Sequence, residues 1–325
     1  DAVKAALDNG INLASVGEAE GKLAALVCSR MKSVEMVRFT NSGTEANIMA
    51  LAGARGFTGR QKVMVFNGGY HGGVFTFPVG VPGSAVNLPI PMVFGTYNDP
   101  EGAAAMIRAE GDQLAAVIVE PMLGSGGCIP ATKEFLGALR EATKETGALL
   151  VFDEVMTSRH SYGGMQERLG ITPDLTTFGK YMAGGMSFGA FGGRADIMAV
   201  FDGHKPGTLP HAGTFNNNAL SMAAGNVALG EIFDRDTAEA LFQRGETLRE
   251  ACNAAAAKHG VAVVFTGLGS MITPHFRKGP VTQPYKGAPE EEQMRELFFL
   301  DLLAAGIYIA RRGMVLFIQI HVCHD

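Results

Sequence analysis

Short apolar runs rich in Val, Ile and Phe alternate along this chain with stretches of helical periodicity. The runs cover residues 37–39, 63–66, 116–119, 149–152 and 175–178. This alternation is typical of a mostly parallel sheet flanked by helices, because each parallel strand needs a long crossover to return to the same edge. We therefore predict an α/β fold. Ligands of such sheets bind at the carboxyl ends of the strands, so the residues just after each run are the candidates for function.

A change of pattern divides the chain. After about residue 215 a long Ala-rich helical stretch is followed by strand-like alternation over 261–276 and by a second helical stretch over 290–303. With 325 residues, the chain also exceeds what one hydrophobic core usually serves. We predict a large domain over residues 1–212 and a smaller α+β domain over residues 213–325.

Composition and charge exclude several functional classes. The net charge of -5 gives no basic field for a nucleic acid, and no Lys/Arg-rich run is present. No apolar stretch reaches the roughly 18 residues of a membrane helix, and the first residues lack the regions of a signal peptide. The four cysteines lie far apart, without metal-ligand spacing, which favours buried thiols in a reducing compartment. We expect a cytoplasmic protein that binds neither nucleic acid nor membrane.

The first candidate motif is the polar turn Asn41-Ser42-Gly43-Thr44-Glu45, which separates a predicted strand from an apolar helix. The N–H groups and hydroxyls of Ser42, Gly43 and Thr44 would lie at the positive end of that helix and suit a phosphate. The alternative is a helix N-cap with a capping-type Glu. The turn lacks the Lys of G-x-x-x-x-G-K-[ST], which argues against a nucleotide-binding P-loop.

The second motif is the glycine-rich stretch 67–73, which follows another predicted strand. Glycines let the backbone approach a flat ligand closely, and Tyr70 or His71 could stack on an aromatic ring. A plain glycine-rich hairpin is the alternative, and this stretch alone does not exclude it. The Pro- and Gly-rich residues 78–91 that follow predict a long surface loop near the site.

Two further strand ends carry groups that suit an aldehyde cofactor. Asp153, followed by Glu154, ends an apolar run, and a buried carboxylate is costly unless it meets a cation such as a protonated pyridine nitrogen. Lys180 follows the next run and precedes flexible glycines, so desolvation could remove its proton and let it form a Schiff base. A structural ion pair for Asp153 and a solvated surface charge for Lys180 are the alternatives. Their order, each after its own strand, favours Schiff-base chemistry.

These motifs, taken in order, resemble those of the class III aminotransferases of pyridoxal 5'-phosphate (PLP) fold type I. The resemblance rests on the stretches FTNSGTEAN, GGYHGG, LVFDEVMTSR, GKYMAGGMSFGAFGGR and GTFNNN, and it covers nearly the whole chain. Within the class the chain is similar to the glutamate-1-semialdehyde aminomutases and more closely to the β-amino acid (β-phenylalanine) aminotransferases. The resemblance implies an enzyme that moves an amino group between an amino acid and a keto acid. The alternatives are an aminomutase-type isomerase and a truncated, inactive PLP-fold protein.

The resemblance also implies a role for each matching residue. The implied contacts are Ser42, Gly43 and Thr44 on the phosphate, Tyr70 and Val155 on the two faces of the ring with His71 beside Tyr70, Glu120 near the ring, Asp153 on its nitrogen, Lys180 as Schiff base and proton shuttle, and Thr214 on the phosphate in a neighbouring subunit. A homodimer with shared sites follows from the role of Thr214.

Both ends of the chain matter for the implied function. In the β-amino acid enzymes a small-domain arginine binds the substrate carboxylate, and Arg312 occupies that position, with a surface charge as the alternative. The family pattern continues ahead of Asp1 and beyond Asp325, so we expect segments to be missing at both ends. The final histidines and cysteine, His321, Cys323 and His324, fit a frayed tail better than a metal site, and we expect no metal.

Overall fold

The computed structural model describes residues 1–12, 15–81, 84–311 and 313–316. The strands are β1 (Met36–Thr40), β2 (Lys62–Phe66), β3 (Met92–Gly95), β4 (Leu114–Val119), β5 (Met122–Leu123), β6 (Ile129–Pro130), β7 (Leu149–Asp153), β8 (Leu175–Gly179), β9 (Gly189–Gly193), β10 (Val264–Leu268), β11 (Met271–His275) and β12 (Val315–Leu316). The α-helices are α1 (Ala2–Leu7), α2 (Glu18–Arg30), α3 (Gly43–Thr58), α4 (Pro100–Glu110), α5 (Lys133–Thr146), α6 (Gly164–Leu169), α7 (Ala195–Met198), α8 (Ala219–Val227), α9 (Arg235–Lys258) and α10 (Pro289–Ala304). Shorter helical turns are η1 (Gly111–Gln113), η2 (Thr157–His160), η3 (Lys180–Ala183), η4 (Ala199–Phe201) and the π-helical η5 (Ala228–Ile232).

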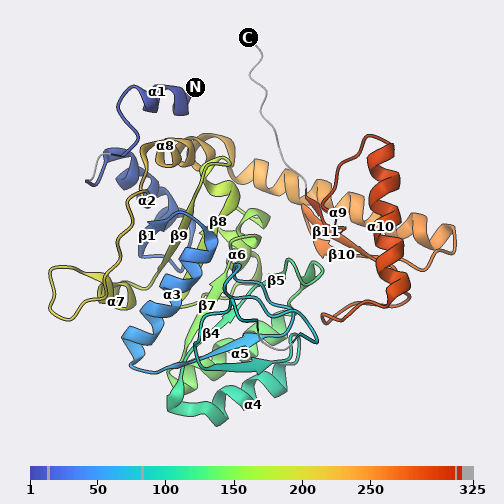
Figure 1. Ribbon diagram of the computed structural model, residues 1–325, viewed down its shortest axis with the longest axis horizontal. Helices are drawn as coiled ribbons and strands as arrows, with labels where there is room; N and C mark the ends of the chain where they lie inside the picture. Colours follow the sequence, from blue (N-terminus) through green and yellow to red (C-terminus); the bar gives the residue numbers. More distant parts are fainter. Residues whose placement is uncertain (13–14, 82–83, 312, 317–325) are drawn as a thin grey trace.

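A seven-stranded sheet organises most of the described chain, with strand order β1-β9-β8-β7-β4-β2-β3 (Figure 1). Each of the five predicted apolar runs forms one of its strands. The pairs β2–β3, β2–β4, β4–β7 and β7–β8 are parallel, whereas β9 runs antiparallel to both β8 and β1. The predicted α/β fold with a mostly parallel sheet flanked by helices is therefore confirmed.

The central strand β4 shows why these runs are apolar throughout. All of its residues are buried, because helices cover both faces of the sheet. Ala116 and Ile118 belong to the core cluster shared with α3 and α7, while Val117 and Val119 belong to the cluster shared with α4, α5 and α6. Successive side chains thus enter opposite cores, which gives a three-layer arrangement with the strand ends left open for a site.

A separate small sheet is built from the last part of the described chain. The strands β10 and β11 pair antiparallel, β12 adds to β11, and α10 follows β11 in sequence. The predicted alternation over 261–276 and the predicted helix over 290–303 are therefore confirmed. The Ala-rich stretch before them is not one helix. It forms α8, which packs on α1 and α2, then the turn η5, and then α9, which reaches the small sheet (Figure 1).

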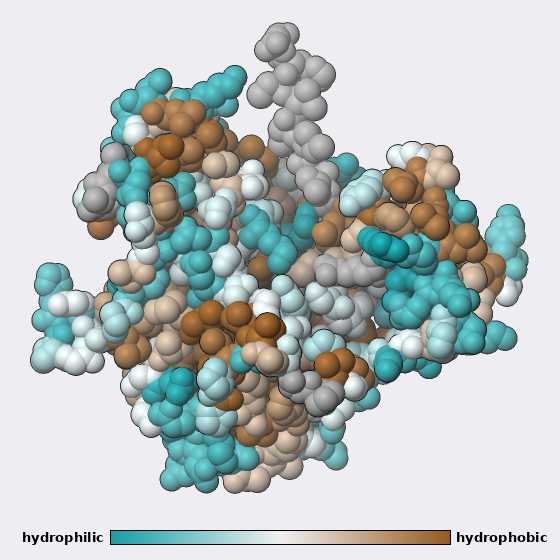
Figure 2. Space-filling view, in the orientation of Figure 1, coloured by the Kyte–Doolittle hydropathy of each residue, from teal (hydrophilic) through white to brown (hydrophobic). Residues whose placement is uncertain are grey.

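One face of α10 carries apolar side chains that stay exposed. Figure 2 shows them as a brown area over α10 at the right of the view. Large side chains of this helix and the residues after it are 44–80% exposed, namely Met294, Leu297, Leu300, Leu303, Ile307 and Tyr308. The small sheet therefore covers only part of the apolar surface of this helix.

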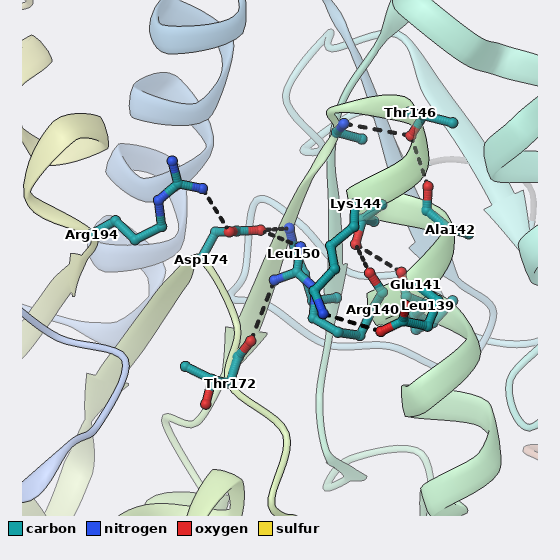
Figure 3. A network of polar contacts seen from close by, with 12 residues as sticks. Leu139, Arg140, Glu141, Ala142, Lys144, Thr146, Leu150, Thr172, Asp174 and Arg194 are labelled. Atoms are coloured by element: carbon teal, nitrogen blue, oxygen red, sulfur yellow. Dashed lines mark hydrogen bonds and ion pairs between the residues drawn. The ribbon is translucent and has the colours of Figure 1, made fainter.

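A buried ion-pair network fixes the opposite edge of the large sheet, where β7 and β8 begin (Figure 3). The carboxylate of Asp174 accepts a hydrogen bond of 2.8 Å from Leu150 N. It also pairs with Arg140 at 2.8 Å and Arg194 at 3.0 Å. Arg140 in turn donates to the Thr172 carbonyl at 3.3 Å. Because Asp174 is 5% exposed, these contacts replace the water that its charge would otherwise need.

Other expectations concern cysteines, membranes and metals. Cys128 is buried, whereas Cys28 and Cys252 are half-buried. Within the described ranges, no helix has the length and apolar character that a bilayer crossing requires. The described side chains likewise include no cluster of three or more His, Cys, Asp or Glu that could hold a metal ion. The final residues His321, Cys323 and His324 lie outside the described residues.

Candidate active site

The carboxyl ends of the parallel strands meet around one cavity. The cavity has a volume of about 760 Å³. It is lined by most of the predicted site residues: Ser42, Gly43 and Thr44 after β1, Tyr70 and His71 after β2, Glu120 after β4, Asp153 and Val155 at the end of β7, and Lys180 after β8. This volume is typical of a small-molecule site. The fold thus brings together residues that are far apart in the sequence, as parallel topology dictates.

Three donors hold the Asp153 carboxylate at the floor of the cavity. Its Oδ2 accepts hydrogen bonds of 2.8 Å from both Asn47 Nδ2 and His71 Nδ1, and its Oδ1 accepts one of 3.0 Å from Val155 N. The Thr177 hydroxyl donates to Asn47 Oδ1 at 2.6 Å and so orients the amide. Asp153 is only 4% exposed, so these donors replace the water that its oxygens would otherwise bind.

Asn47 is a site residue that the sequence interpretation missed. It lies one turn into α3, 2% exposed, and its amide also donates to the His71 carbonyl at 3.0 Å. The FTNSGTEAN stretch contains this residue, but its capping and anion-binding signals come from the turn that precedes it. An Asn on an otherwise Ala-rich helix face was the available signal.

The structure separates the two rings that were candidates for stacking. His71 is buried, its Nδ1 faces Asp153, and its ring packs against Phe75 and Phe77 at centroid distances of 6.1 and 6.5 Å. Tyr70, in contrast, is 40% exposed at the cavity wall. Of the two, Tyr70 therefore presents the more accessible ring to a ligand, and His71 is placed to act on Asp153.

The turn before α3 combines both predicted interpretations. Ser42 Oγ accepts a hydrogen bond of 3.2 Å from Glu45 N, and Glu45 Oε2 accepts one of 2.9 Å from Asn41 N, so the N-cap is real. Helix geometry leaves the N–H groups of Gly43 and Thr44 without an intrahelical acceptor. Both residues line the cavity, which places these donors and the positive end of α3 toward any anion bound there.

Two glycines are required by close packing at this end of the cavity. A Cβ on Gly43 would lie 2.7 Å from the methyl carbons of Val155. Gly72 has a φ of 118°, and a side chain on it would overlap Thr44. The N-terminus of α3 therefore packs directly against Val155 after β7 and against the glycine-rich stretch after β2.

Lys180 is the first residue after β8 and has an unusual backbone. Its φ of 52° lies in the left-handed region, which non-glycine residues rarely adopt. Its side chain lines the cavity but is exposed rather than deeply buried. Desolvation, which we expected to remove its proton, is therefore not provided by the described residues alone.

The adjacent carboxylates Asp153 and Glu154 have different surroundings. Glu154 points away from the cavity and accepts hydrogen bonds from Met165 N at 2.6 Å and Gln166 N at 3.1 Å. Burial raises the pKa of Glu154 to about 6, against these hydrogen bonds, which lower it. Glu154 therefore anchors α6, and Asp153 alone of this pair serves the cavity.

Glu120 is a buried acid beside the cavity floor. Its Oε1 accepts from Tyr70 N and its Oε2 from Gly124 N, both at 2.9 Å. Burial raises the pKa of Glu120 to about 7. The neighbouring His71 lowers this pKa, whereas the neighbouring Asp153 raises it. Glu120 thus orders the backbone of Tyr70 and carries a charge that depends on pH near neutrality.

Thr214 is not among the residues that line the cavity. Thr214 is exposed, and its carbonyl accepts a hydrogen bond of 2.6 Å from Asn12 Nδ2. Arg312 lies outside the described residues, while its neighbour Arg311 is exposed and pairs with Glu296 at 2.8 Å. The described residues of the predicted loop over 78–91 have irregular backbone, as expected, but none of them lines the cavity.

The second half of the cavity was not predicted and is mostly apolar. Its wall comes from segments after β7, β8 and α8, with Met156, Arg159, Tyr181, Met186, Phe188, Ile232, Phe233, Thr237 and Leu241. The rings of Tyr181 and Phe233 pack edge to face at 5.1 Å. Apolar residues of this kind are indistinguishable from core residues in a sequence.

The described residues fit PLP. The Asp153 carboxyl group can accept a hydrogen bond from a pyridine N–H, and the N–H groups at the start of α3 can bind a phosphate. The aliphatic side chain of Val155 and the accessible ring of Tyr70 line the same cavity, where they can contact a flat ring.

Comparison with known proteins agrees with this geometry. The family model described as "Aminotransferase class-III" matches residues 1–323. The β-phenylalanine transaminase of Variovorax paradoxus is 51% identical over 315 residues, which is 97% of this chain and 72% of the relative. The glutamate-1-semialdehyde 2,1-aminomutase of Rhodopirellula baltica is 38% identical over 322 residues, covering 95% of this chain and 73% of the relative.

Solved structures give the same result. The crystal structure of the Variovorax paradoxus β-phenylalanine aminotransferase superposes with a TM-score of 0.94 over 97% of this chain and 73% of that one, at 51% identity. A structure described as a transaminase with PLP bound has a TM-score of 0.86 at 32% identity, covering 97% of this chain and 76% of that one. The predicted fold type I is therefore confirmed. The chain belongs to the class III aminotransferases, and it is a PLP-dependent transaminase.

Proposed function

We propose that this chain transfers the amino group of a β-amino acid to a keto acid, with Lys180 as the covalent anchor of PLP. The observation that carries the proposal is the single cavity shared by Lys180 and Asp153, which end neighbouring strands of the sheet. The further contacts we propose are Ser42, Gly43 and Thr44 for the phosphate, Tyr70 and Val155 for the ring faces, and His71 and Glu120 as supports of Asp153 and Tyr70.

PLP, when bound, supplies an electron sink for the bond that breaks at the substrate carbon. Asp153, held in place by three hydrogen-bond donors, would accept a hydrogen bond from the N–H of the ring nitrogen. Lys180 Nζ would accept the proton from the substrate carbon that bears nitrogen and return a proton after transfer. Tyr70 and Val155 would contact the two faces of the ring.

Reductive trapping tests the anchor. The protein is incubated with PLP, reduced with borohydride, digested and mapped by mass spectrometry. We expect the pyridoxyl label on Lys180 and its loss in Lys180→Arg, which keeps the charge. Lys205, an exposed lysine beside Asp202, provides the matched control Lys205→Arg, in which the label should persist. A label on another lysine, or on none, would refute the proposed anchor.

The substrate class rests on the comparison with β-phenylalanine transaminase and on the apolar half of the cavity, which suits an apolar side chain. We propose that Arg312 binds the substrate carboxylate, as a bidentate pair. The test supplies β-phenylalanine with 2-oxoglutarate and measures glutamate. Isomerised glutamate-1-semialdehyde without glutamate would instead favour the aminomutase activity that the Rhodopirellula baltica relative is named for.

We propose a cytoplasmic homodimer in which Thr214 completes the partner's site, with a large domain over 1–212 and a small one over 213–325. The exposure of Thr214 and the 56% exposure of Phe215 support the shared site, and the separate sheet β10-β11-β12 supports the division. Mixing Lys180→Ala and Thr214→Ala chains is the test. If sites are shared, a mixed dimer keeps one intact site and regains activity that neither parent has.

A further inference from the structure

A short hairpin connects the cavity floor to the small sheet. Its strands β5 and β6 pair antiparallel, and the turn between them runs from Gly124 to Cys128. Within the turn, Gly127 N and Cys128 N both donate to the Gly124 carbonyl at 3.2 Å. The peptide groups of Gly124 and Gly127 are therefore fixed relative to each other.

At one end, this turn holds a site residue. Gly124 N donates to Glu120 Oε2 at 2.9 Å, and Glu120 Oε1 accepts from Tyr70 N at 2.9 Å. A Cβ on Gly124 would lie 2.5 Å from Met156 Sδ, so the turn is packed tightly against the cavity wall. A shift of Gly124 would displace Glu120 and, through it, the backbone that carries the Tyr70 ring.

At the other end, the small sheet holds the same turn. His275 Nε2 on β11 contacts the Gly127 carbonyl at 2.9 Å, and Thr266 Oγ1 on β10 donates to that carbonyl at 2.9 Å. His275 is 3% exposed. Gly127 has a φ of 112°, and a Cβ on it would lie 2.7 Å from His275 Cε1, so only glycine permits this approach.

Both ring nitrogens of His275 have partners. Nε2 lies 2.9 Å from the Gly127 carbonyl oxygen, which can only accept, and 2.8 Å from the Thr266 hydroxyl, which can donate or accept. The Tyr285 hydroxyl lies 3.1 Å from Nδ1. Burial lowers the pKa of His275, which favours the neutral imidazole. An imidazole fixed in this way is a rigid connection between the small sheet and the hairpin.

We propose that His275 is a positioning residue for the cofactor ring, and that it acts through Gly127, Gly124 and Glu120 on Tyr70. This inference rests on the proposed function, in which Tyr70 contacts the ring. Every step of the path is a direct hydrogen bond or a peptide segment closed by turn hydrogen bonds. The small sheet thereby influences the position of the PLP ring, although His275 itself does not line the cavity.

His275→Phe and His275→Gln test the path, the first removing both nitrogens and the second retaining an amide donor. We expect the dissociation constant of PLP to rise about fivefold in His275→Phe and to stay within about twofold of the wild type in His275→Gln. The visible circular dichroism of bound PLP should also fall in His275→Phe, because it reports how the ring is seated. In the transaminase assay, kcat should fall more than KM rises.

Two further variants make the result decisive. Thr266→Val removes the second donor to Gly127 and should weaken PLP binding in the same direction, with less than additive effect in the double variant. His259→Phe, at the exposed end of α9, should change nothing. If His275→Phe does not fold, Thr266→Val and Tyr285→Phe carry the test.

A lower Tm in His275→Phe with unchanged PLP affinity and dichroism would overturn the proposal, since His275 would then only stabilise the fold. Borohydride mapping of the wild type separates this failure from that of the proposed function. If only the role of His275 is wrong, the label still lies on Lys180. If the proposed function is wrong, the label does not lie on Lys180.

Discussion

His71 Nδ1 lies 2.8 Å from Asp153 Oδ2, and both side chains are almost completely buried, at 2% and 4% exposure. The imidazole and the Asn47 amide thus give two partners to one carboxyl oxygen in a place that water does not reach. His71 therefore fixes the position of the Asp153 carboxyl group at the floor of the cavity.

His71→Phe should weaken PLP binding by about tenfold, because a buried hydrogen bond to the Asp153 carboxyl group is lost while Asn47 still holds that group. Fluorescence titration of the apoenzyme with PLP measures the change. His204→Phe is a matched control on an exposed residue and should leave the affinity unchanged. Equal affinities of His71→Phe and wild type would contradict the role given to His71.

Gly43→Ala should lower PLP affinity by about tenfold or more, because the new methyl group would displace the side chain of Val155, which we propose as a contact of the ring. Val155→Ala in the same chain should restore part of the affinity by making room. The measurement is again PLP titration of both variants and the double variant. Additive losses in the double variant would show that the contact between these two residues does not affect PLP binding.

The pH dependence of stability should carry a contribution from Glu120. Its pKa in the folded chain is about 7, above the ordinary value of 4.5, because of burial. A raised pKa means that the folded state binds this proton more tightly, so the stability it contributes is complete below about pH 4.5 and is lost as the pH rises to about 7.

The wild type should therefore lose more Tm than Glu120→Gln between pH 5 and pH 8. Thermal unfolding of both proteins across this range measures the difference between the two slopes. Glu101→Gln, at an exposed position near the start of α4, is the control and should follow the wild type. Parallel curves for wild type and Glu120→Gln would exclude the contribution.

Asp174→Ala should destabilise the fold without altering the chemistry. It removes the partner of Arg140 and the acceptor of Leu150 N at the edge of the sheet opposite the cavity (Figure 3). We expect a loss of about 3 kcal/mol in the free energy of unfolding by urea, with kcat close to wild type at low temperature. Asp196→Ala, which removes an exposed carboxylate beside Arg194, should cost about 0.5 kcal/mol or less.

The central strands could be predicted because parallel strands buried on both faces must be apolar along their whole length. The strand β9 could not, since its sequence GAFGG lacks the branched residues that mark a strand. Its glycines are required because a Cβ on Gly189 would overlap the backbone of Ser42, and one on Gly192 would lie 2.5 Å from the Met36 carbonyl oxygen. The glycines of β9 are therefore set by close contacts with neighbouring segments, and no local sequence pattern reveals such contacts.

Within the candidate site, residues at strand ends were predictable and the residues that support them were not. Asp153 and Lys180 follow apolar runs, so their position in the sequence already indicates the open edge of the sheet. Asn47 and His275 contact residues that are far from them in the sequence and close to them only in the folded chain. The path from His275 to the cavity therefore had no counterpart in any motif.

Lys180 illustrates a conflict between chemistry and folding. Its left-handed backbone, with a φ of 52°, costs a non-glycine residue about 1–2 kcal/mol. Glycine at this position would relieve that cost, and a chain selected for thermal endurance alone would carry it. Such a chain would lack the amine that we propose as the anchor of PLP, so the unfavourable backbone at Lys180 is a cost that the fold carries for a side chain needed in the cavity.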